Sequence, residues 1–357
     1  MSRRRIDQLL PGFADGDAIS NAAVIIRASL LKSGYESDIY APMNRVSPPL
    51  RNECMNLYDY DPPSDSISIC HYGISSPATR FFLNSRTRKI LVYHNITPAE
   101  YFRGFYDKVA DSLQTARKEL PEIAGQSDAV WAVSRFNASE LEEMGISSVQ
   151  VFELPFSTRL LDTPPDEELL ERRRAPLTTI LFTGRIAPNK RIEDLIMSFA
   201  WYHKTINRQS RLLVVGSNRS CPRYFTMLRM MVGDLDMPNI CLEGFASQGG
   251  LSAYYQVSDL YMCASEHEGY CLPLLEAMHK GLPVISRASG GAPEAMGGAG
   301  ILYEDLAPRE LAELMHLAMS DEVIRSEILD KQRKRVEQAV SRPLSDEIQQ
   351  LLSGFIR

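Results

Sequence analysis

Short apolar runs alternate with longer segments of helical spacing along most of this chain. In the first 160 residues the runs that are typical of buried parallel strands lie at 6–10, 37–41, 67–72, 89–94, 129–134 and 149–154. Segments 18–33 and 136–144 instead place apolar residues three and four positions apart, as helices do. This alternation predicts an α/β domain with a parallel sheet.

The same alternation resumes near residue 178. Strands are predicted at 178–184, 211–216, 239–244, 260–265 and 282–286, and helices at 192–206, 273–280, 307–319, 322–340 and 344–355. The polar stretch between the two series contains two adjacent prolines and three consecutive arginines, so it predicts an interdomain linker. We therefore expect a first domain at 1–160, a linker at 161–176, a second domain at 177–340 and a C-terminal segment at 341–357.

The stretch from Asp259 to Glu294 holds the densest chemistry in the chain. Its predicted strand is followed by the polar loop 266–270 and by a helix that begins near Pro273. The loop therefore lies at the carboxyl end of a strand, where open parallel sheets bind ligands. The exposed amides of the helix start favour an anion, and Gly269 lets a phosphate approach the backbone closely.

Two carboxylates, Glu268 and Glu276, flank this helix start. A phosphate repels a carboxylate, so we expect both residues to accept hydrogen bonds from hydroxyl groups instead. A ribose and a hexose are the obvious hydroxyl carriers that are attached to phosphates. The alternative is structural: Glu276 as a charge near a helix N-terminus and Glu268 as a solvated loop acid.

Two cations follow the first predicted strand of the second domain. The sequence after residue 178 reads T-T-I-L-F-T-G-R-I-A-P-N-K, with Arg185 and Lys190 in the turn beyond the strand. Arg185 can contact a diphosphate through two parallel hydrogen bonds, and Lys190 can act as a point charge. Without the carboxylates above, the pair would be interpreted as surface charge.

The second domain contains the runs G-R-x-x-x-x-K and S-E-H-E-G-Y-C-L-P-L-L-E-A-M-x-x-G-L-P-V-I. Together they resemble the motifs of glycosyltransferase family 4, the glycosyl transferases group 1. The spacing E-x7-E of Glu268 and Glu276 specifies no family by itself, but about ten further positions around these residues agree with the motif of this family. The resemblance implies a GT-B fold, with two Rossmann-like β/α/β domains facing each other across a cleft. It also implies a C-terminal helix that crosses back to the first domain, for which the buried stripe would be Ile348, Leu351, Leu352 and Phe355.

The resemblance also implies roles for individual residues. Catalytic roles fall on Glu268, His94, Arg185 and Lys190, and donor binding falls on Gly16, Gly184, Arg185, Lys190, Gly216, Phe245, Glu268, Gly269, Tyr270, Cys271, Leu272 and Glu276. Gly16 stands between two aspartates where the family more often has two adjacent glycines, so a plain capped turn is the alternative. His94 ends a predicted strand, and a satisfied structural histidine is its alternative.

Composition adds expectations about partners and location. The net charge of −6 does not favour nucleic-acid binding, and no apolar run approaches the roughly 20 residues that span a bilayer. The start of the chain lacks the apolar core of a signal peptide, so we expect a cytoplasmic protein. The two D-x-D matches, at 59–61 and 234–236, are interpreted as chance, and we expect no metal and no cofactor.

These observations predict a retaining glycosyltransferase that moves a hexose from a UDP- or GDP-sugar to a hydroxyl of a glycan or lipid-linked acceptor, as in cell-surface polysaccharide assembly. The alternative is a GT-B sugar-nucleotide-binding protein or epimerase without transferase activity. Stretches 80–89 and 101–106 are rich in cations and aromatics, which suggests peripheral contact with the inner face of a membrane. The alternative there is that Phe81, Phe82 and Phe102 are core residues and the cations are solvated.

Overall fold

The computed structural model describes residues 4–159 and 161–354 and separates into two compact units. Unit 1 comprises 1–98, 111–156 and 341–357, and unit 2 comprises 99–110 and 157–340. Each unit contains one sheet in which every strand pair is parallel, with α-helices between most successive strands. This confirms the predicted α/β class with two Rossmann-like units. Residues 99–110 belong to unit 2, although they precede the predicted linker.

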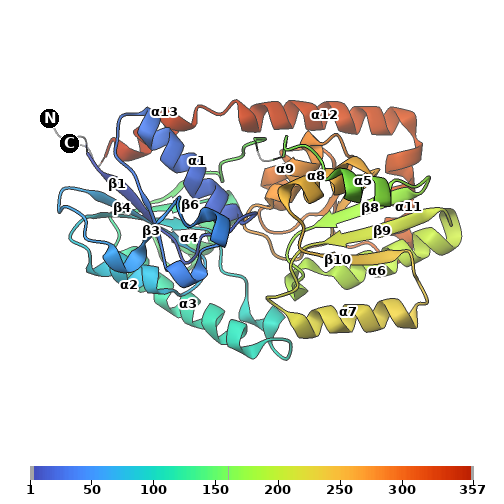
Figure 1. Ribbon diagram of the computed structural model, residues 1–357, viewed down its shortest axis with the longest axis horizontal. Helices are drawn as coiled ribbons and strands as arrows, with labels where there is room; N and C mark the ends of the chain where they lie inside the picture. Colours follow the sequence, from blue (N-terminus) through green and yellow to red (C-terminus); the bar gives the residue numbers. More distant parts are fainter. Residues whose placement is uncertain (1–3, 160, 355–357) are drawn as a thin grey trace. The chain divides into compact units, whose positions relative to one another are not determined.

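Unit 1 is built on a seven-stranded sheet of order β3-β2-β1-β4-β5-β6-β7. Its strands are β1 Ile6–Leu9, β2 Ile39–Ala41, β3 Met55–Asn56, β4 Ile67–Tyr72, β5 Arg88–Tyr93, β6 Ala129–Ala132 and β7 Val149–Val151. Its helices are α1 Ala18–Lys32, α2 Pro77–Asn84, α3 Asp107–Gly125, α4 Arg135–Glu143 and α13 Leu344–Leu352. The connections β1–α1–β2 and β4–α2–β5 run in opposite directions along the sheet. Because such crossovers are right-handed, α1 and α2 cover opposite faces (Figure 1).

The C-terminal helix α13 packs in unit 1, beside α1 (Figure 1). Ile348 and Leu352 of the predicted apolar stripe are buried, and Leu351 is half-buried. The fourth member of that stripe, Phe355, lies outside the described residues. The chain therefore completes unit 2 and then returns to the unit in which it began, as the GT-B fold requires.

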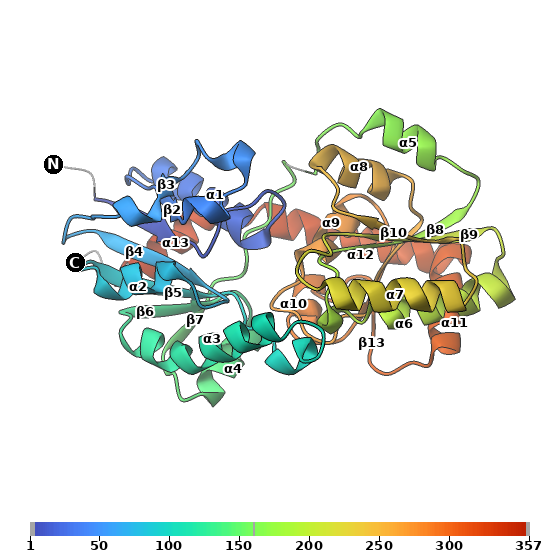
Figure 2. The same ribbon diagram turned by 60° about the horizontal axis from the view of Figure 1, so that its bottom comes forward.

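Unit 2 is built on a six-stranded sheet of order β10-β9-β8-β11-β12-β13. Its strands are β8 Thr178–Thr183, β9 Ser210–Val215, β10 Ile240–Gly244, β11 Leu260–Cys263, β12 Val284–Arg287 and β13 Ile301–Tyr303. Its helices are α5 Glu167–Arg173, α6 Ile192–Trp201, α7 Pro222–Asp234, α8 Gln248–Gln256, α9 Leu272–His279, α10 Ala292–Met296, α11 Pro308–Ser320 and α12 Glu322–Val340. Figure 2 shows α5, α8 and α9 on one face of the sheet and α6, α7 and α11 on the other.

The stretch predicted as a linker contains a helix. Asp166 caps α5 by accepting a hydrogen bond from the Leu169 amide at 3.0 Å. Leu169 and Leu170 are buried where α5 packs against α8 (Figure 2), and Arg173 pairs with Glu243. Only two apolar residues stand among the charges of this segment. That is too short a stripe to show a helical period in the sequence, so this helix was not predicted.

Both sheets reverse their strand order at one place. In unit 2 the chain runs from β8 outward through β9 to β10, and then crosses to β11 on the other side of β8. In unit 1 the corresponding reversal lies between β1 and β4. A crevice opens beyond the carboxyl ends of the two strands at such a point, and open α/β sheets bind their ligands there. The loops after β8 and β11, and those after β1 and β4, are therefore where a site is expected.

Two of the aromatic residues proposed for membrane contact are packed inside their units. Phe82 and Phe102 are buried, and Phe81 stacks edge-on against Tyr58, with ring centroids 5.6 Å apart. Stretch 80–89 lies in unit 1 and stretch 101–106 in unit 2. Phe82 and Phe102 are therefore core residues, as the alternative interpretation of these stretches expected. Within the described residues, no helix is long and apolar enough to cross a membrane.

Candidate active site

The loops after β8 and β11 are tied together by hydrogen bonds that centre on Asn189. The Glu266 amide donates to the Asn189 carbonyl at 2.9 Å, and the Asn189 side chain donates to the His267 carbonyl at 3.0 Å. Asn189 is buried, so these bonds are shielded from water. The two loops therefore hold a fixed register, which places the residues that follow, Lys190 and Glu268, opposite each other.

Lys190 and Glu268 form an ion pair in which Lys190 Nζ lies 2.6 Å from Glu268 Oε1. Their side chains are only 13% and 9% exposed. Burial alone would raise the pKa of Glu268, but the charge of Lys190 and its hydrogen bonds hold that pKa below its ordinary value. Burial opposes the charge of Lys190 in the same way, and Glu268 outweighs it and raises the pKa of Lys190. Both groups are therefore charged at neutral pH.

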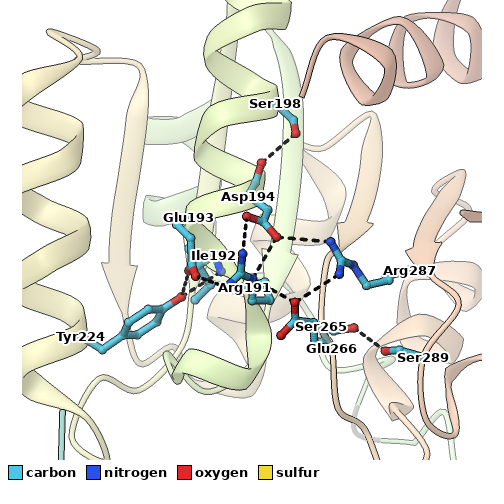
Figure 3. A network of polar contacts seen from close by, with 10 residues as sticks. All are labelled: Arg191, Ile192, Glu193, Asp194, Ser198, Tyr224, Ser265, Glu266, Arg287 and Ser289. Carbon is cyan, nitrogen blue, oxygen red and sulfur yellow. Dashed lines mark hydrogen bonds and ion pairs between the residues drawn. The ribbon is translucent and has the colours of Figure 1, made fainter. Parts of the chain in front are cut away.

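A second set of charges fixes the start of α6 against the β11 loop (Figure 3). Arg191 Nε lies 3.0 Å from Asp194 and 3.4 Å from Glu266, and Arg287 bridges the same two acids at 3.4 and 3.3 Å. Arg191 has a φ of +50°, in the left-handed region that non-glycine residues rarely adopt. This network was not predicted, although the charges of K-R-I-E-D after Asn189 and of S-E-H-E before Gly269 are visible in the sequence.

Glu276 of α9 is connected to the end of β8 through Tyr255. The Tyr255 hydroxyl donates to Glu276 Oε2 at 3.1 Å and lies 3.0 Å from Thr183 Oγ1. Burial raises the pKa of Glu276, and the hydrogen bond from Tyr255 partly offsets this. Thr183 is the last residue of β8 and precedes Gly184. Glu276 is therefore held beside the strand end from which the cationic loop starts.

Glycines bring the backbones of neighbouring loops into contact. A Cβ atom on Gly216 would lie 1.7 Å from the Gly184 carbonyl oxygen, and one on Gly291 would lie 2.3 Å from the Gly269 oxygen. The Gly291 amide also donates to the Glu268 carbonyl at 2.8 Å. The loop after β12 thereby supports the Glu268 loop from behind. Sequence alone did not assign this role to Gly291.

In unit 1, His94 ends a chain of hydrogen bonds that crosses three neighbouring strands. The Gln8 amide nitrogen donates to the Ala23 carbonyl, so its oxygen, 2.9 Å from His71 Nε2, must accept. His71 Nδ1 then accepts from His94 Nε2 at 2.8 Å. Burial lowers the pKa of His71 to about 3 and that of His94 well below its ordinary value. Both rings are therefore neutral, and His94 Nδ1 keeps an unprotonated lone pair.

Gly16 lies in the loop after β1, beside the start of α1. It has a φ of +72°, and the following Asp17 caps α1 by accepting from the Ser20 amide at 2.9 Å. The left-handed backbone explains why glycine stands at this position. The capped turn that was the structural alternative for this loop is present, and it is compatible with a ligand contact at Gly16.

Residues 171–340 match the family model described as Glycosyl transferases group 1. This part of the chain belongs to that family. The glycosyl transferase domain contains the Lys190–Glu268 pair, the connection from Thr183 to Glu276 and the glycine contacts between loops. Gly16 and His94 lie outside the matched residues.

Two curated relatives extend the likeness beyond the glycosyl transferase domain. The serotype-specific mannosyltransferase WbdA of Escherichia coli is 24% identical over 275 residues, which are 72% of this chain and 32% of that protein. The chain thus spans about a third of the length of WbdA. The lipopolysaccharide 1,2-N-acetylglucosaminetransferase of Salmonella typhimurium is 21% identical over 343 residues, which are 85% of this chain and 87% of that protein.

Solved structures resemble the whole chain in fold. The sucrose-phosphate synthase from Thermosynechococcus elongatus superposes with a TM-score of 0.76 at 17% identity, and the match covers 99% of each chain. At this identity the likeness shows the fold alone. That fold is GT-B, as the sequence motifs implied.

The remaining predicted donor residues of the glycosyl transferase domain differ in exposure. Arg185 is exposed, and no ion pair to it occurs within the part of the chain that the structure describes. Phe245 follows β10 and is 64% exposed. Leu272 is buried at the start of α9. The buried Tyr270 accepts a hydrogen bond from Arg335 of α12 at 3.1 Å, so its side chain anchors the loop within the unit.

Proposed function

We propose that the chain is a retaining glycosyltransferase that transfers a hexose from a UDP- or GDP-sugar to a hydroxyl of a glycan or glycoconjugate. The observation that carries this proposal is the buried Lys190–Glu268 pair beside the start of α9, at the point where the strand order of unit 2 reverses. The family of residues 171–340 and the transferases named above support it.

When the donor binds, its groups would replace Lys190 and Glu268 as each other's partners. Its diphosphate would draw the Lys190 ammonium, with help from Arg185 and the amides at the start of α9. Glu268, released from Lys190, would accept a hydrogen bond from a sugar hydroxyl. Each buried charge would keep a partner, which matters because removing one partner of a buried pair is costly. A nucleoside diphosphate without sugar would leave Glu268 without that partner.

The other donor contacts follow from the same geometry. Gly184, Gly216 and Gly269 would let the diphosphate and nucleoside approach the backbone.

Glu276 would accept both hydroxyl hydrogen bonds of the ribose, and exposed Phe245 would contact the base. Glu276→Gln should then weaken binding of the ribonucleotide and change binding of its dideoxy analogue little. Equal losses for both ligands would assign Glu276 a structural role only.

Catalysis in this proposal is positioning and electrostatic stabilisation of the leaving diphosphate. No covalent nucleophile is assigned. The sugar is transferred on the face that the diphosphate leaves, and a leaving phosphate oxygen takes the proton from the acceptor hydroxyl. His94, with its unprotonated Nδ1, would accept a hydrogen bond from a substrate hydroxyl, and Gly16 would contact the diphosphate. The reaction would need no divalent metal, so it should continue in excess chelator.

Two measurements test the function. A thermal-shift screen of UDP, GDP and ADP identifies the base, since a ligand at a hundred times its Kd stabilises a protein by about 2.7 kcal/mol. Assays of hydrolysis and transfer with the matching nucleotide sugars and mixed glycan acceptors follow. Transfer with retention of anomeric configuration supports the proposal. Donor binding without transfer or hydrolysis would favour a sugar-nucleotide-binding protein, and epimerised donor would favour an epimerase.

We further propose that the acceptor is a glycan or lipid-linked glycan reached from the cytoplasmic side, with peripheral contact at the inner face of the membrane. The exposed cations Arg80, Arg86 and Arg88 of unit 1 support the contact. Each could contribute about 1 kcal/mol near an anionic surface. Sedimentation with liposomes should increase with anionic lipid and fall when these arginines are changed to serine. No binding at low salt would favour an acceptor free in solution.

A further inference from the structure

Two buried thiols lie on either side of the Glu268 loop. Cys263 ends β11 and Cys271 immediately precedes α9, and their sulfurs are 4.0 Å apart. Both side chains are buried. The proposed transfer reaction uses neither thiol, and no role has been given to Cys263.

The backbone at Cys271 is in a conformation that favours glycine. Its φ is +75° and its ψ +64°, in the left-handed region, which costs a residue with a Cβ atom roughly 1–2 kcal/mol. Glycine would adopt this conformation without strain. A thiol is nevertheless present here and lies within contact of a second thiol. Strain of this kind at a ligand loop indicates a role for the side chain.

The two sulfurs and the Glu268 carboxylate form one compact set of possible metal ligands. One ligand atom from each of Cys263, Glu268 and Cys271 lies within 4.8 Å of the other two. Two sulfurs bound to one zinc at about 2.3 Å and the tetrahedral angle lie about 3.8 Å apart. Sulfurs in a disulfide lie about 2.05 Å apart. The observed 4.0 Å therefore suits a shared metal ion with little movement, whereas a disulfide needs the loop to shift by nearly 2 Å.

The charges of this cluster also balance around a divalent cation. Without metal, Lys190 and Glu268 neutralise each other. With one divalent cation, the two thiolates offset its two charges, and the Lys190–Glu268 charges still cancel. A divalent cation bound to the two thiolates therefore leaves no net buried charge. Thiolate sulfur is a soft ligand, which favours zinc over magnesium or manganese.

We propose that Cys263, Cys271 and Glu268 form a binding site for a soft divalent cation of the zinc class, with a fourth position open to water. The ion is not a cofactor of transfer. It occupies the carboxylate that the sugar of the donor is proposed to use, so bound zinc should exclude the nucleotide sugar. This competition rests on the proposed function, whereas metal binding itself does not.

Cobalt titration of the reduced, metal-free full-length protein tests the site. We expect one Co²⁺ per chain, with the absorption of a tetrahedral thiolate complex, and full displacement by Zn²⁺. Affinity should rise with pH, because a thiol must lose its proton to bind the metal. Absence of a tetrahedral thiolate spectrum would overturn the proposal.

Variants separate the site from general loss of structure. Cys263→Ser and Cys271→Gly should each weaken cobalt binding at least about 100-fold, because loss of even an outer-shell partner of a ligand costs about 10- to 100-fold. Cys271→Gly should also raise Tm without metal, because glycine relieves the left-handed backbone. Cys241→Ser, which removes another thiol of unit 2, is the matched control and should leave affinity unchanged. Unchanged binding in a folded Cys271→Gly protein would contradict the proposal.

Competition with the donor distinguishes the metal site from the proposed function. The matching nucleotide sugar should weaken zinc binding, and the nucleoside diphosphate alone should weaken it less. If zinc binds with the expected ligands but the nucleotide sugar leaves its affinity unchanged, the metal site stands and the assignment of Glu268 to the donor sugar is wrong.

Discussion

The Lys190 ammonium lies 2.6 Å from the Glu268 carboxylate, although 78 residues separate the two in sequence. The proposed function assigns Lys190 to the phosphates of the donor and Glu268 to its sugar. The structure shows that each is the other's partner. At the proposed donor site, such a pair can be exchanged for ligand groups of matching charge, so it would set a condition on what can bind there.

Removing one partner of this pair should destabilise unit 2. Lys190→Met leaves Glu268 buried without its counterion, and such changes cost about 3–5 kcal/mol. Urea unfolding followed by circular dichroism measures this loss, and the double variant Lys190→Met/Glu268→Gln should recover part of it. The exposed pair Arg309–Glu313 is the control, where Arg309→Met should cost at most about 1 kcal/mol. Equal effects at the two pairs would contradict the burial argument.

Acid should destabilise unit 1 through its two coupled histidines. The pKa of His71 falls to about 3 in the folded chain, and that of His94 also falls below its ordinary 6.5. The unfolded chain then binds more protons. The stabilisation is complete above pH 6.5 and is lost as pH falls below it, and His71 alone contributes a loss of about 1.4 kcal/mol per pH unit down to about pH 3. His71→Gln should flatten the slope between pH 4 and 6, and exposed His316→Gln should not.

Gln8 should determine which nitrogen of His94 carries the proton. Gln8→Leu removes the acceptor of His71 Nε2, so the direction of the His71–His94 hydrogen bond is no longer fixed. Nitrogen NMR of the histidine rings should show His94 protonated on Nε2 in the wild type and a mixture of tautomers in Gln8→Leu. Gln8→Glu retains an acceptor oxygen and should keep the wild-type pattern. An unchanged tautomer in Gln8→Leu would show that the relay does not control His94.

Gly291→Ala should weaken donor binding, although Gly291 is not expected to touch the donor. Its new Cβ would lie 2.3 Å from the Gly269 carbonyl oxygen, so the loop that carries Glu268 must move. The φ of Gly291 is −81°, which alanine tolerates, so the effect would come from this contact alone. Nucleotide-sugar affinity should fall at least tenfold by calorimetry. Gly233→Ala on α7, where nothing lies within 4 Å of the added atom, should leave it unchanged.

Much of the fold could be predicted because its central strands are buried on both sides and are therefore continuous apolar runs. The run at 67–72 coincides with β4, and 178–184 exceeds β8 by one residue. Helices α7 and α8 were not predicted. Pro222 at the start of α7 and the Ser247 cap of α8 were available signals, but the apolar stripes that should accompany them are weak. Tertiary packing, which local pattern does not encode, completes those helices.

The candidate site could be located from the sequence, but its internal partners could not. The loop around Glu268 and the turn with Arg185 and Lys190 are local patterns, so spacing and residue type were enough to find them. The pairing of Lys190 with Glu268 depends on β8 and β11 being neighbours, which only the sheet order reveals. His71 lies inside an apolar strand, and nothing in the sequence distinguishes it from a core residue.

The most direct test of the account is calorimetric binding of the nucleotide sugar and of its nucleoside diphosphate to wild type and Glu268→Gln. Loss of a charge-assisted hydrogen bond, about 1.5–3 kcal/mol, should weaken binding of the nucleotide sugar by roughly 10- to 100-fold. Affinity for the nucleoside diphosphate should stay the same or rise, because Lys190 is then free to bind phosphate. An equal loss for both ligands, or none for the nucleotide sugar, would contradict the exchange of partners between the ion pair and the donor.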